Sequence, residues 1–194
     1  MRRVPAQIAG KLLAAAELFA ERGLDNTKIE DVAAATGVAK ATLYYYFAGK
    51  EEILGFLLQD MLTQIADQVA IAVQTPSATA AQRMREVIRA QLSVMSEQPA
   101  VCRALVGDLG RAGRIPDIAA AMREAYYEPV EALLAEGALD GSLAPQAHLP
   151  AAAAALFGAV TITGLLYLVA EHPLDPDAAT DAVLAVVMAG LRPR

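Results

Sequence analysis

Four consecutive aromatic residues, Tyr44, Tyr45, Tyr46 and Phe47, form the stretch best suited to contact another molecule. Successive residues of a helix point about 100° apart, so four adjacent rings cannot all face one core. Tyrosine hydroxyls can bond phosphate oxygens, and ring edges can meet base edges or thymine methyl groups. The run therefore predicts a nucleic-acid-binding surface. Packing of the tyrosines against a second domain is the alternative, and it is strongest for Tyr44.

The elements that position this run follow from the spacing around it. Leu43 and Phe47 are four residues apart and should share the inward face of a helix. Tyr44 should then lie at the edge of that face. The residues left on or beside the outward face are Lys40, Thr42, Tyr45 and Tyr46.

Residues 29–48 fit a helix-turn-helix. Ala33 is small where the two helices would cross, and Gly37 tolerates a positive φ in the turn four residues later. The apolar residues that would set the angle between the helices are Ile29, Val32, Val38 and Leu43. An earlier helix should end near Gly23. Thr27 should cap the next one, with Glu30 completing a capping box.

The segment TKIEDVAAATGVAKATLYYYFAGKEEIL (27–54) resembles the DNA-binding signature of the TetR family of transcriptional regulators, and the likeness extends over about residues 8–58. The resemblance implies an all-α homodimer. Its three-helix DNA-binding domain would occupy residues 1–48, and its helical ligand-binding and dimerisation domain residues 49–194. The DNA target would be a palindromic operator with half-sites about one helical turn apart.

The resemblance also assigns contacts to individual residues. It implies phosphate contacts at Thr27, Lys28, Thr42, Tyr44, Tyr46 and Lys50, and base-edge contacts near Lys40, Ala41 and Tyr45. Physical reasoning independently supports some of them, because a helix beginning at Thr27 and Lys28 offers free N–H groups to a phosphate. Two positions depart from the family pattern. The family often has glycine at the position of Ala41 and histidine at the position of Tyr46.

The charge is distributed in agreement with this division. The chain of 194 residues has a net charge of −6, but residues 1–50 carry seven basic and five acidic side chains, a balance of +2. The remaining residues carry nine arginines and seventeen acids, a balance of −8. Such asymmetry indicates a small module that meets an anion and an acidic body that does not.

The rest of the chain is predicted to be helical throughout, with about nine helices in all. Ala and Leu are abundant, Gly and Pro fall at boundaries, and no alternating strand pattern is evident. The predicted later helices span about 50–74, 79–97, 99–109, 116–136, 146–171 and 176–191. Pro129 should kink or divide the fourth of these.

Residues 149–170 carry no charge over twenty-two residues. This length could span a membrane, but a helix that is apolar on all sides can also be buried between its own domain and a second subunit. We favour the second interpretation and predict a four-helix dimer interface, with no membrane contact. Its predicted residues are Ala152, Ala155, Gly158, Ala159, Val183, Val186, Val187 and Leu191.

The body should also hold an apolar pocket for an apolar or aromatic small molecule, chiefly because the family resemblance implies one. Its candidate residues are Met61, Met84, Met95, Cys102, Met122, Tyr126, Phe157 and Tyr167, each of which could equally be plain core. Binding there would shift the dimer away from the recognition-helix spacing that DNA requires. A regulator or activator of the same fold without a ligand is the alternative.

No catalytic constellation is visible in the sequence. His148 and His172 would lie more than ~30 Å apart along the apolar segment and so could not share a metal. The single cysteine, Cys102, rules out an intramolecular disulfide. No secretory hydrophobic segment follows the basic first residues. We therefore expect a cytoplasmic DNA-binding repressor that is not an enzyme and has no cofactor or metal.

Overall fold

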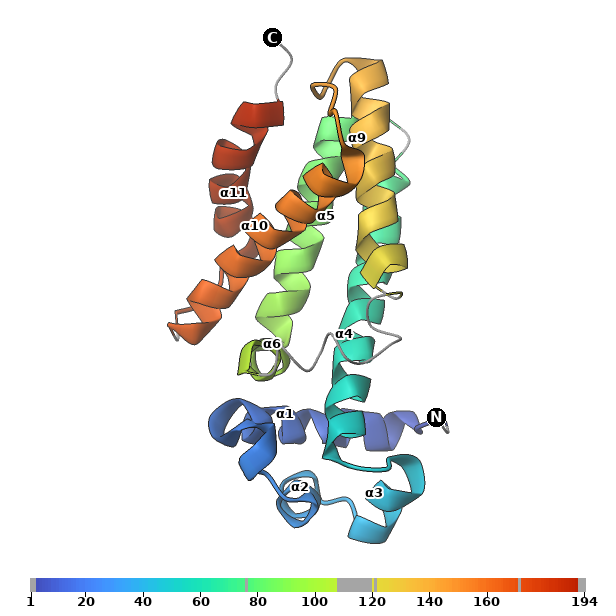
Figure 1. Cartoon of the computed structure of the whole chain (residues 1–194), viewed down its shortest axis with the longest axis vertical. Helices are drawn as coiled ribbons and strands as arrows, with labels where there is room; N and C mark the ends of the chain where they lie inside the picture. Colours follow the sequence, from blue (N-terminus) through green and yellow to red (C-terminus); the bar gives the residue numbers. More distant parts are fainter. Residues whose placement is uncertain (1–2, 76, 108–119, 121, 171, 192–194) are drawn as a thin grey trace. The chain divides into compact units, whose positions relative to one another are not determined.

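The computed structural model describes residues 3–75, 77–107, 120, 122–170 and 172–191, and within these ranges all the regular structure is helical (Figure 1). The helices of the first half are α1 (Ala6–Asn26), α2 (Ile29–Thr36), α3 (Lys40–Tyr46), α4 (Lys50–Val73), α5 (Ala80–Glu97) and α6 (Pro99–Gly107). Those of the second half are the π-helical turn η1 (Arg123–Tyr127), α9 (Glu128–Asp140), α10 (Leu149–Val169) and α11 (Pro176–Leu191). The all-α prediction is confirmed.

The chain forms two compact units, and each is made of two segments that are separated in the sequence. The N-terminal unit combines residues 1–61 with 98–119, and the C-terminal unit combines 62–97 with 120–194. The first half of α4 and all of α6 therefore group with the helix-turn-helix. The boundary predicted after residue 48 lies at the end of that motif and leaves both of these pieces out.

The N-terminal unit is built around α1, which packs against α2 and α6 (Figure 1). Its core side chains recur at helical spacing and are almost completely buried. They include Leu12, Ala15, Phe19, Leu43, Phe47 and Ile53. The side chains of Arg103 on α6 and Glu17 on α1 form an ion pair of 3.0 Å, which links the two helices at the surface. The result is a three-helix domain with α6 added to its first helix.

Two glycines shape this unit through their backbone conformation. Gly23 interrupts α1 with a φ of +73°, and Gly37 ends α2 with a φ of +62°. An added Cβ would meet no atom within 4 Å at Gly37, so glycine is required there for its backbone angle and not for space. Both predicted breaks are confirmed.

The cap of α2 differs from the prediction. Lys28, not Thr27, is the N-cap residue, and its N–H donates to Asp31 Oδ2 at 2.9 Å. Glu30 lies one residue too early for this bond and instead forms an ion pair with Lys40. Asp31 therefore supplies the carboxylate that the predicted capping box assigned to Glu30.

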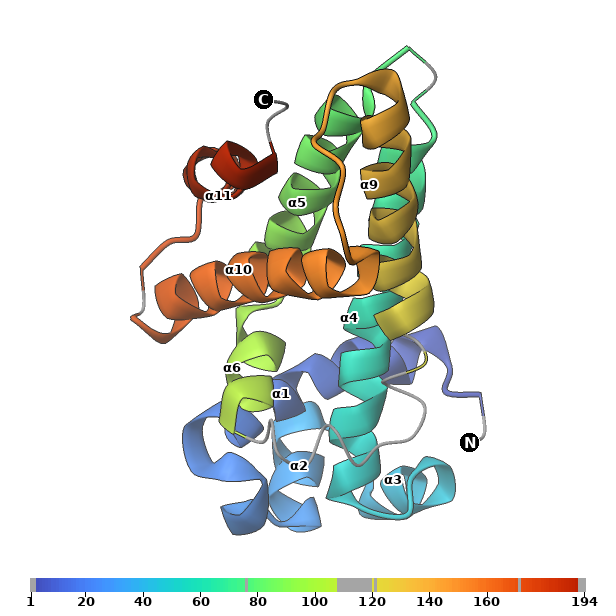
Figure 2. The same ribbon diagram turned by 45° about the horizontal axis from the view of Figure 1, so that its top comes forward.

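In the C-terminal unit, α5 contacts α9, α10 and α11, and α10 crosses it (Figure 2). Asp140, at the end of α9, caps the start of α5 by accepting a hydrogen bond of 2.9 Å from the Ala80 N–H. That bond lowers the pKa of Asp140 and so keeps its carboxylate charged. A contact between residues sixty positions apart thus fixes α5 against α9.

The π-helical turn η1 stands where Pro129 was expected to disturb a helix. Pro129 cannot donate a backbone hydrogen bond, and its ring clashes with the carbonyl four residues earlier. The preceding turn is widened, so that the Glu128 N–H reaches the Arg123 carbonyl five residues back. Residues 116–119 and 121 of the predicted 116–136 helix lie outside the described residues.

Helix α10 is apolar all round but is not buried all round. Its buried residues are Ala153, Leu156, Val160, Gly164, Leu165 and Leu168. Its large exposed residues are Ile162, Leu166, Tyr167 and Val169. Among the described helices, α10 is long and apolar enough to cross a membrane, which by itself is weak evidence. A row of buried residues packed on α5, α9 and α11 is what a core helix of a globular domain displays.

Candidate nucleic-acid interface

The second helix of the helix-turn-helix presents an aromatic surface to solvent. Tyr44 is 52% exposed and Tyr45 is 58% exposed, whereas Leu43 and Phe47 are buried. The buried pair holds α3 against its domain, as the spacing of four residues predicts. Two adjacent exposed aromatic rings form a contiguous apolar patch, and such patches mark interaction sites. Helix α3 therefore has the fixed inward face and the exposed outward face of a recognition helix.

Lys40 begins α3 and sits beside two partners. Its ammonium forms an ion pair with Glu30 of α2 and lies 5.8 Å from the centre of the Tyr44 ring. The hydrogen bond between the two side chains raises the pKa of Lys40 and lowers the pKa of Glu30. Both groups are therefore fully charged at neutral pH. The positive charge beside the Tyr44 ring is therefore held in place by an acid from the other helix of the motif.

The remaining predicted contacts on α3 differ in exposure. Ala41 is exposed, while Thr42 and Tyr46 are half-buried. The Tyr46 ring meets the Tyr45 ring edge-on, with centroids 4.9 Å apart. Tyr46 therefore supports Tyr45 through ring packing. The family often has histidine at this position, and the uncharged tyrosine ring found here is suited to that packing.

Thr27 requires a correction as a phosphate contact. Its side chain is completely buried, and its hydroxyl donates to the Gly23 carbonyl at 2.9 Å. A group enclosed in this way cannot reach a phosphate without opening the junction between α1 and α2. Lys28 is exposed, but its N–H is already bonded to Asp31, so only its side chain is available to an anion.

Lys50 has a structural task that the sequence did not indicate. Its ammonium donates to the Thr27 carbonyl at 2.9 Å and to the Asp25 carbonyl at 3.1 Å. The lysine at the start of α4 thus fastens the segment that joins α1 to α2. An ammonium has three donor positions, so one is left that could serve a phosphate.

The predicted pocket residues are divided between the two units. Met61 and Cys102 contact each other in the N-terminal unit, with the thiol 3.7 Å from the thioether sulfur. Burial raises the pKa of Cys102 to about 12, so the thiol is inert at neutral pH. Tyr167 is 41% exposed on α10, and its assignment to an internal pocket is wrong.

Tyr126 and Phe157 do meet inside the C-terminal unit, with ring centroids 5.0 Å apart. Tyr127 completes the cluster at 5.4 Å from Phe157. Met84 and Met95 are buried on α5, and Met122 is half-buried before η1. Sequence reasoning missed Gln91, a buried polar residue on α5 whose side-chain N–H donates to Thr161 Oγ1 of α10 at 2.8 Å. The sequence feature that could have indicated Gln91 is a glutamine at a position where an amphipathic helix should place an apolar residue in the core.

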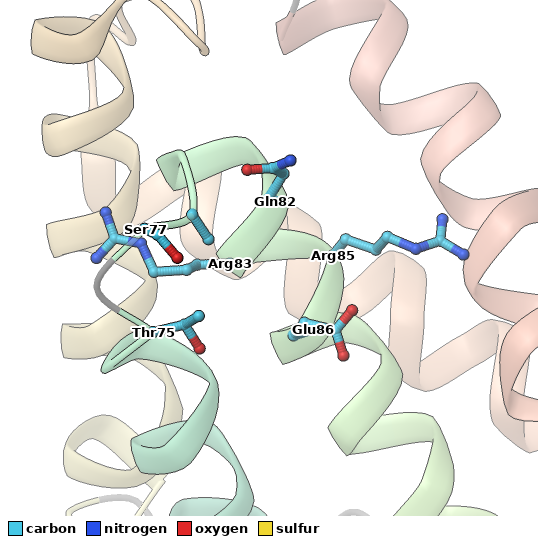
Figure 3. Close-up of a pocket in the computed structure, with 7 residues that line it drawn as sticks. Thr75, Ser77, Gln82, Arg83, Arg85 and Glu86 are labelled. Atoms are coloured by element: carbon cyan, nitrogen blue, oxygen red, sulfur yellow. The ribbon is translucent and has the colours of Figure 1, made fainter.

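A surface hollow of about 450 Å³ lies where α4 ends and α5 begins (Figure 3). Arg83 and Arg85 line it but point in opposite directions, toward carboxylates on other helices. Arg83 forms an ion pair with Glu136, and Arg85 with Asp181 at 2.6 Å. Since both guanidinium groups are engaged, this hollow has little to offer an anionic ligand. No group of three His, Cys, Asp or Glu residues that could hold a metal occurs within the described residues.

The fold and the α3 surface together define a helix-turn-helix DNA-binding protein. Residues 12–55 match the family model described as bacterial regulatory proteins, tetR family. The fatty acid metabolism regulator protein of Bacillus subtilis (strain 168) is 24% identical over 181 residues, which cover 92% of this chain and 92% of that relative. The DNA-binding domain is thus that of the TetR family, and the chain is a DNA-binding transcriptional regulator.

Solved structures share the whole fold. The fatty acid degradation regulator FadR of Bacillus halodurans has a TM-score of 0.84 at 19% identity, and the match covers 100% of both chains. The transcriptional regulator FadR of Bacillus subtilis, solved in complex with stearoyl-CoA, has a TM-score of 0.79 at 23% identity. That match covers 93% of this chain and 98% of the other. At these identities the likeness establishes the architecture.

Proposed function

We propose that this regulator is a cytoplasmic repressor that binds a palindromic operator as a homodimer and is released by an apolar small molecule. The observation that carries the DNA-binding part is the α3 surface, where Lys40, Tyr44 and Tyr45 face solvent while Leu43 and Phe47 fix the helix. Lys40, Ala41 and Tyr45 would meet base edges. Thr42, Tyr44, Tyr46, Lys28 and the remaining donor of Lys50 would meet phosphates.

The homodimer is supported by the outer face of α10 and α11. On α10, Ile162, Leu166 and Val169 are exposed at helical spacing, Leu166 by 64%, and on α11 Val186 is 77% exposed. Ala155 on α10 is exposed, and Ala152, Gly158 and Ala159 are half-exposed, so a partner helix could approach closely. Val187 is half-buried, whereas Val183 packs in the core of its own chain and would support the interface only from behind. The side chain of Leu191 lies outside the described residues.

The effector is proposed to be an apolar small molecule bound within the C-terminal unit. The aromatic cluster of Tyr126, Tyr127 and Phe157 supports this assignment; Tyr126 is buried and the other two rings are half-buried. Long-chain acyl compounds are the first class to test, because one relative regulates fatty acid metabolism and a structural neighbour was solved with stearoyl-CoA. An effector that binds the non-DNA-binding dimer more tightly would shift the population and release the operator.

Selection of binding sites from random duplex DNA by the purified full-length protein tests the proposal. An enriched inverted repeat with half-sites about one helical turn apart is expected, and it would serve as the probe for effector release. No enrichment at low salt by folded protein would refute operator binding by the free protein. If an operator is enriched but no acyl compound or other ligand reduces binding to it, a regulator of this fold without an effector would be favoured.

A further inference from the structure

Three buried side-chain atoms of the C-terminal unit have no hydrogen-bond partner among the described residues. One is Nε of Arg83, whose other two guanidinium nitrogens are bonded, and the other two lie deep in the core. They are Oε1 of Gln91 on α5 and the hydroxyl of Tyr126 in η1, and each of these residues is 1% exposed. Nearly all buried polar groups in proteins are paired, because leaving one unpaired costs folding free energy. Two unpaired atoms in one core therefore require an explanation.

Both atoms belong to residues that contact the same stretch of α10. Gln91 donates its side-chain N–H to Thr161 Oγ1, and the Tyr126 ring packs on the Phe157 ring. Phe157 and Thr161 are four residues apart on α10 and so share one face of that helix. The two residues that carry the unpaired atoms thus contact neighbouring turns of α10, one from α5 and one from η1.

The π-helical turn is what brings Tyr126 inward. The extra residue in its turn shifts the helical phase, so Tyr126 is buried while Tyr127 remains half-buried at the edge. Such turns are rare in proteins overall, and those that occur are often found at functional sites. Burial raises the pKa of Tyr126, so its hydroxyl keeps its proton at neutral pH and remains a hydrogen-bond donor.

The surroundings lack a charge that could hold an anion. Ile88 and Met95 flank Gln91 on the same face of α5, and both are buried apolar residues. Each of the four arginines in the described part of this unit is paired with a carboxylate. The pairs are Arg83–Glu136, Arg85–Asp181, Arg89–Asp177 and Arg123–Glu128. A carboxylate or phosphate buried beside Gln91 would therefore meet no described counter-ion.

We propose that Gln91 and Tyr126 are the polar end of an internal effector site, and that the site takes an apolar molecule carrying one neutral hydroxyl group in its buried part. A hydroxyl donates to Gln91 Oε1 and accepts from the Tyr126 O–H, so one group satisfies both atoms. A methyl group satisfies neither. If the Gln91 amide is turned over, the hydroxyl accepts from its nitrogen instead and still fits. The inference rests on the proposed apolar effector and specifies its chemistry.

The test compares hydroxyl and methyl probes of matched shape: phenol with toluene, and cyclohexanol with methylcyclohexane. Binding is measured on the full-length protein without DNA, by calorimetry and by the shift in melting temperature. The wild-type protein should prefer the hydroxyl probe by roughly tenfold. Tyr126→Phe should reduce the preference to about twofold while leaving toluene affinity unchanged. Tyr127→Phe, the same change one residue along the turn, should retain the preference.

The free protein supplies a second readout with the opposite sign. Tyr126→Phe removes an unpaired buried hydroxyl, so its melting temperature without probe should equal or exceed that of the wild type. Gln91→Leu should also lose the hydroxyl preference. A lower melting temperature for Tyr126→Phe with an unchanged preference would identify a structural hydroxyl and overturn the inference.

Absence of binding by all four probes would also overturn the inference. These failures are separable from failure of the proposed function, because operator selection and acyl-dependent release are measured on DNA. Hydroxyl-selective binding that leaves the operator complex intact would retain the site and refute its role in release.

Discussion

Helices α3 and α10 both expose large side chains to solvent, yet they expose different chemistry. The outward face of α3 carries tyrosine hydroxyls and the Lys40–Glu30 ion pair. The outward face of α10 carries Ile162, Leu166 and Val169, on a helix with no charge in 21 residues. The first face suits a charged polymer with polar grooves, and the second suits another apolar surface. Several large exposed side chains on one helix face therefore indicate an interface, and the polar atoms on that face indicate the class of partner.

The sharpest way to break this comparison is to place a charge on the α10 face. In a symmetric dimer, Leu166→Glu introduces two carboxylates, and burial of each without a partner costs several kcal/mol. We expect the dimer to weaken by roughly a thousandfold or more, as measured by sedimentation over a dilution series. The matched control is Leu139→Glu, at an exposed position of α9 outside this face. Equal dimerisation of both variants would remove α10 from the interface.

The next largest effect is expected for the buried face of α3. Leu43→Ala removes a fully buried side chain and should lower the free energy of unfolding by about 2–5 kcal/mol. Denaturant unfolding measures this change, and operator binding should fall with it. Leu139→Ala, the same substitution at an exposed leucine, should change the free energy of unfolding by less than ~0.5 kcal/mol. A similar small effect at Leu43 would mean that α3 is not held as the structure indicates.

The fold could be predicted where its signals are local. Gly37 needs a positive φ, and the spacing of Leu43 and Phe47 fixes which face of α3 is buried, so the helix-turn-helix followed from neighbouring residues. Contacts between distant residues left no such pattern. The hydrogen bond between Gln91 and Thr161 joins positions 70 residues apart, and α6 packs on α1 across a comparable separation.

The binding surface was predictable in part for the same reason. The outward tyrosines follow from helical periodicity, and their exposure agrees with it. Thr27 did not follow, because a threonine before a helix can accept at the N-cap or turn back to bond a carbonyl, and only the junction with α1 decides. Lys50 did not follow either, since its two carbonyl partners precede it by 23 and 25 residues.

The polar ends of the Lys40 and Tyr45 side chains on α3 should control which DNA sequence is preferred. Tyr45→Ala should change or relax the preference, because each base-edge interaction contributes ~1–3 kcal/mol of discrimination, and Lys40→Ala should do the same. Competition binding with single-base operator variants measures this. Lys28→Ala, which removes an exposed charge from the start of α2, should instead weaken binding to all sequences equally. An unaltered preference in Tyr45→Ala would assign that ring to the phosphate backbone.

Substitution of Lys50 tests a structural role and a DNA-binding role of the same side chain by two different measurements. Lys50→Ala removes two hydrogen bonds from the junction of α1 and α2, and we expect a loss of about 1–2 kcal/mol in the free energy of unfolding. If the third donor also reaches a phosphate, the slope of log binding constant against log salt should fall by about 1. A lower slope is expected, together with weaker binding to all sequences. An unchanged slope with lower stability would leave Lys50 as a clamp alone.

The smallest expected effect concerns the acid that holds Lys40. Glu30→Gln removes a negative charge beside the proposed phosphate path and frees the lysine, so DNA affinity should rise, by less than about fivefold for an exposed pair. Because the ion pair lowers the pKa of Glu30, the carboxylate is charged throughout pH 6–8, and the difference between variant and wild type should be constant across that range. Glu124→Gln, an exposed acid in the C-terminal unit, supplies the control and should leave affinity unchanged. Weaker and less selective binding by Glu30→Gln would reverse this interpretation, because it would mean that the acid orients Lys40 for base recognition and does not restrain it.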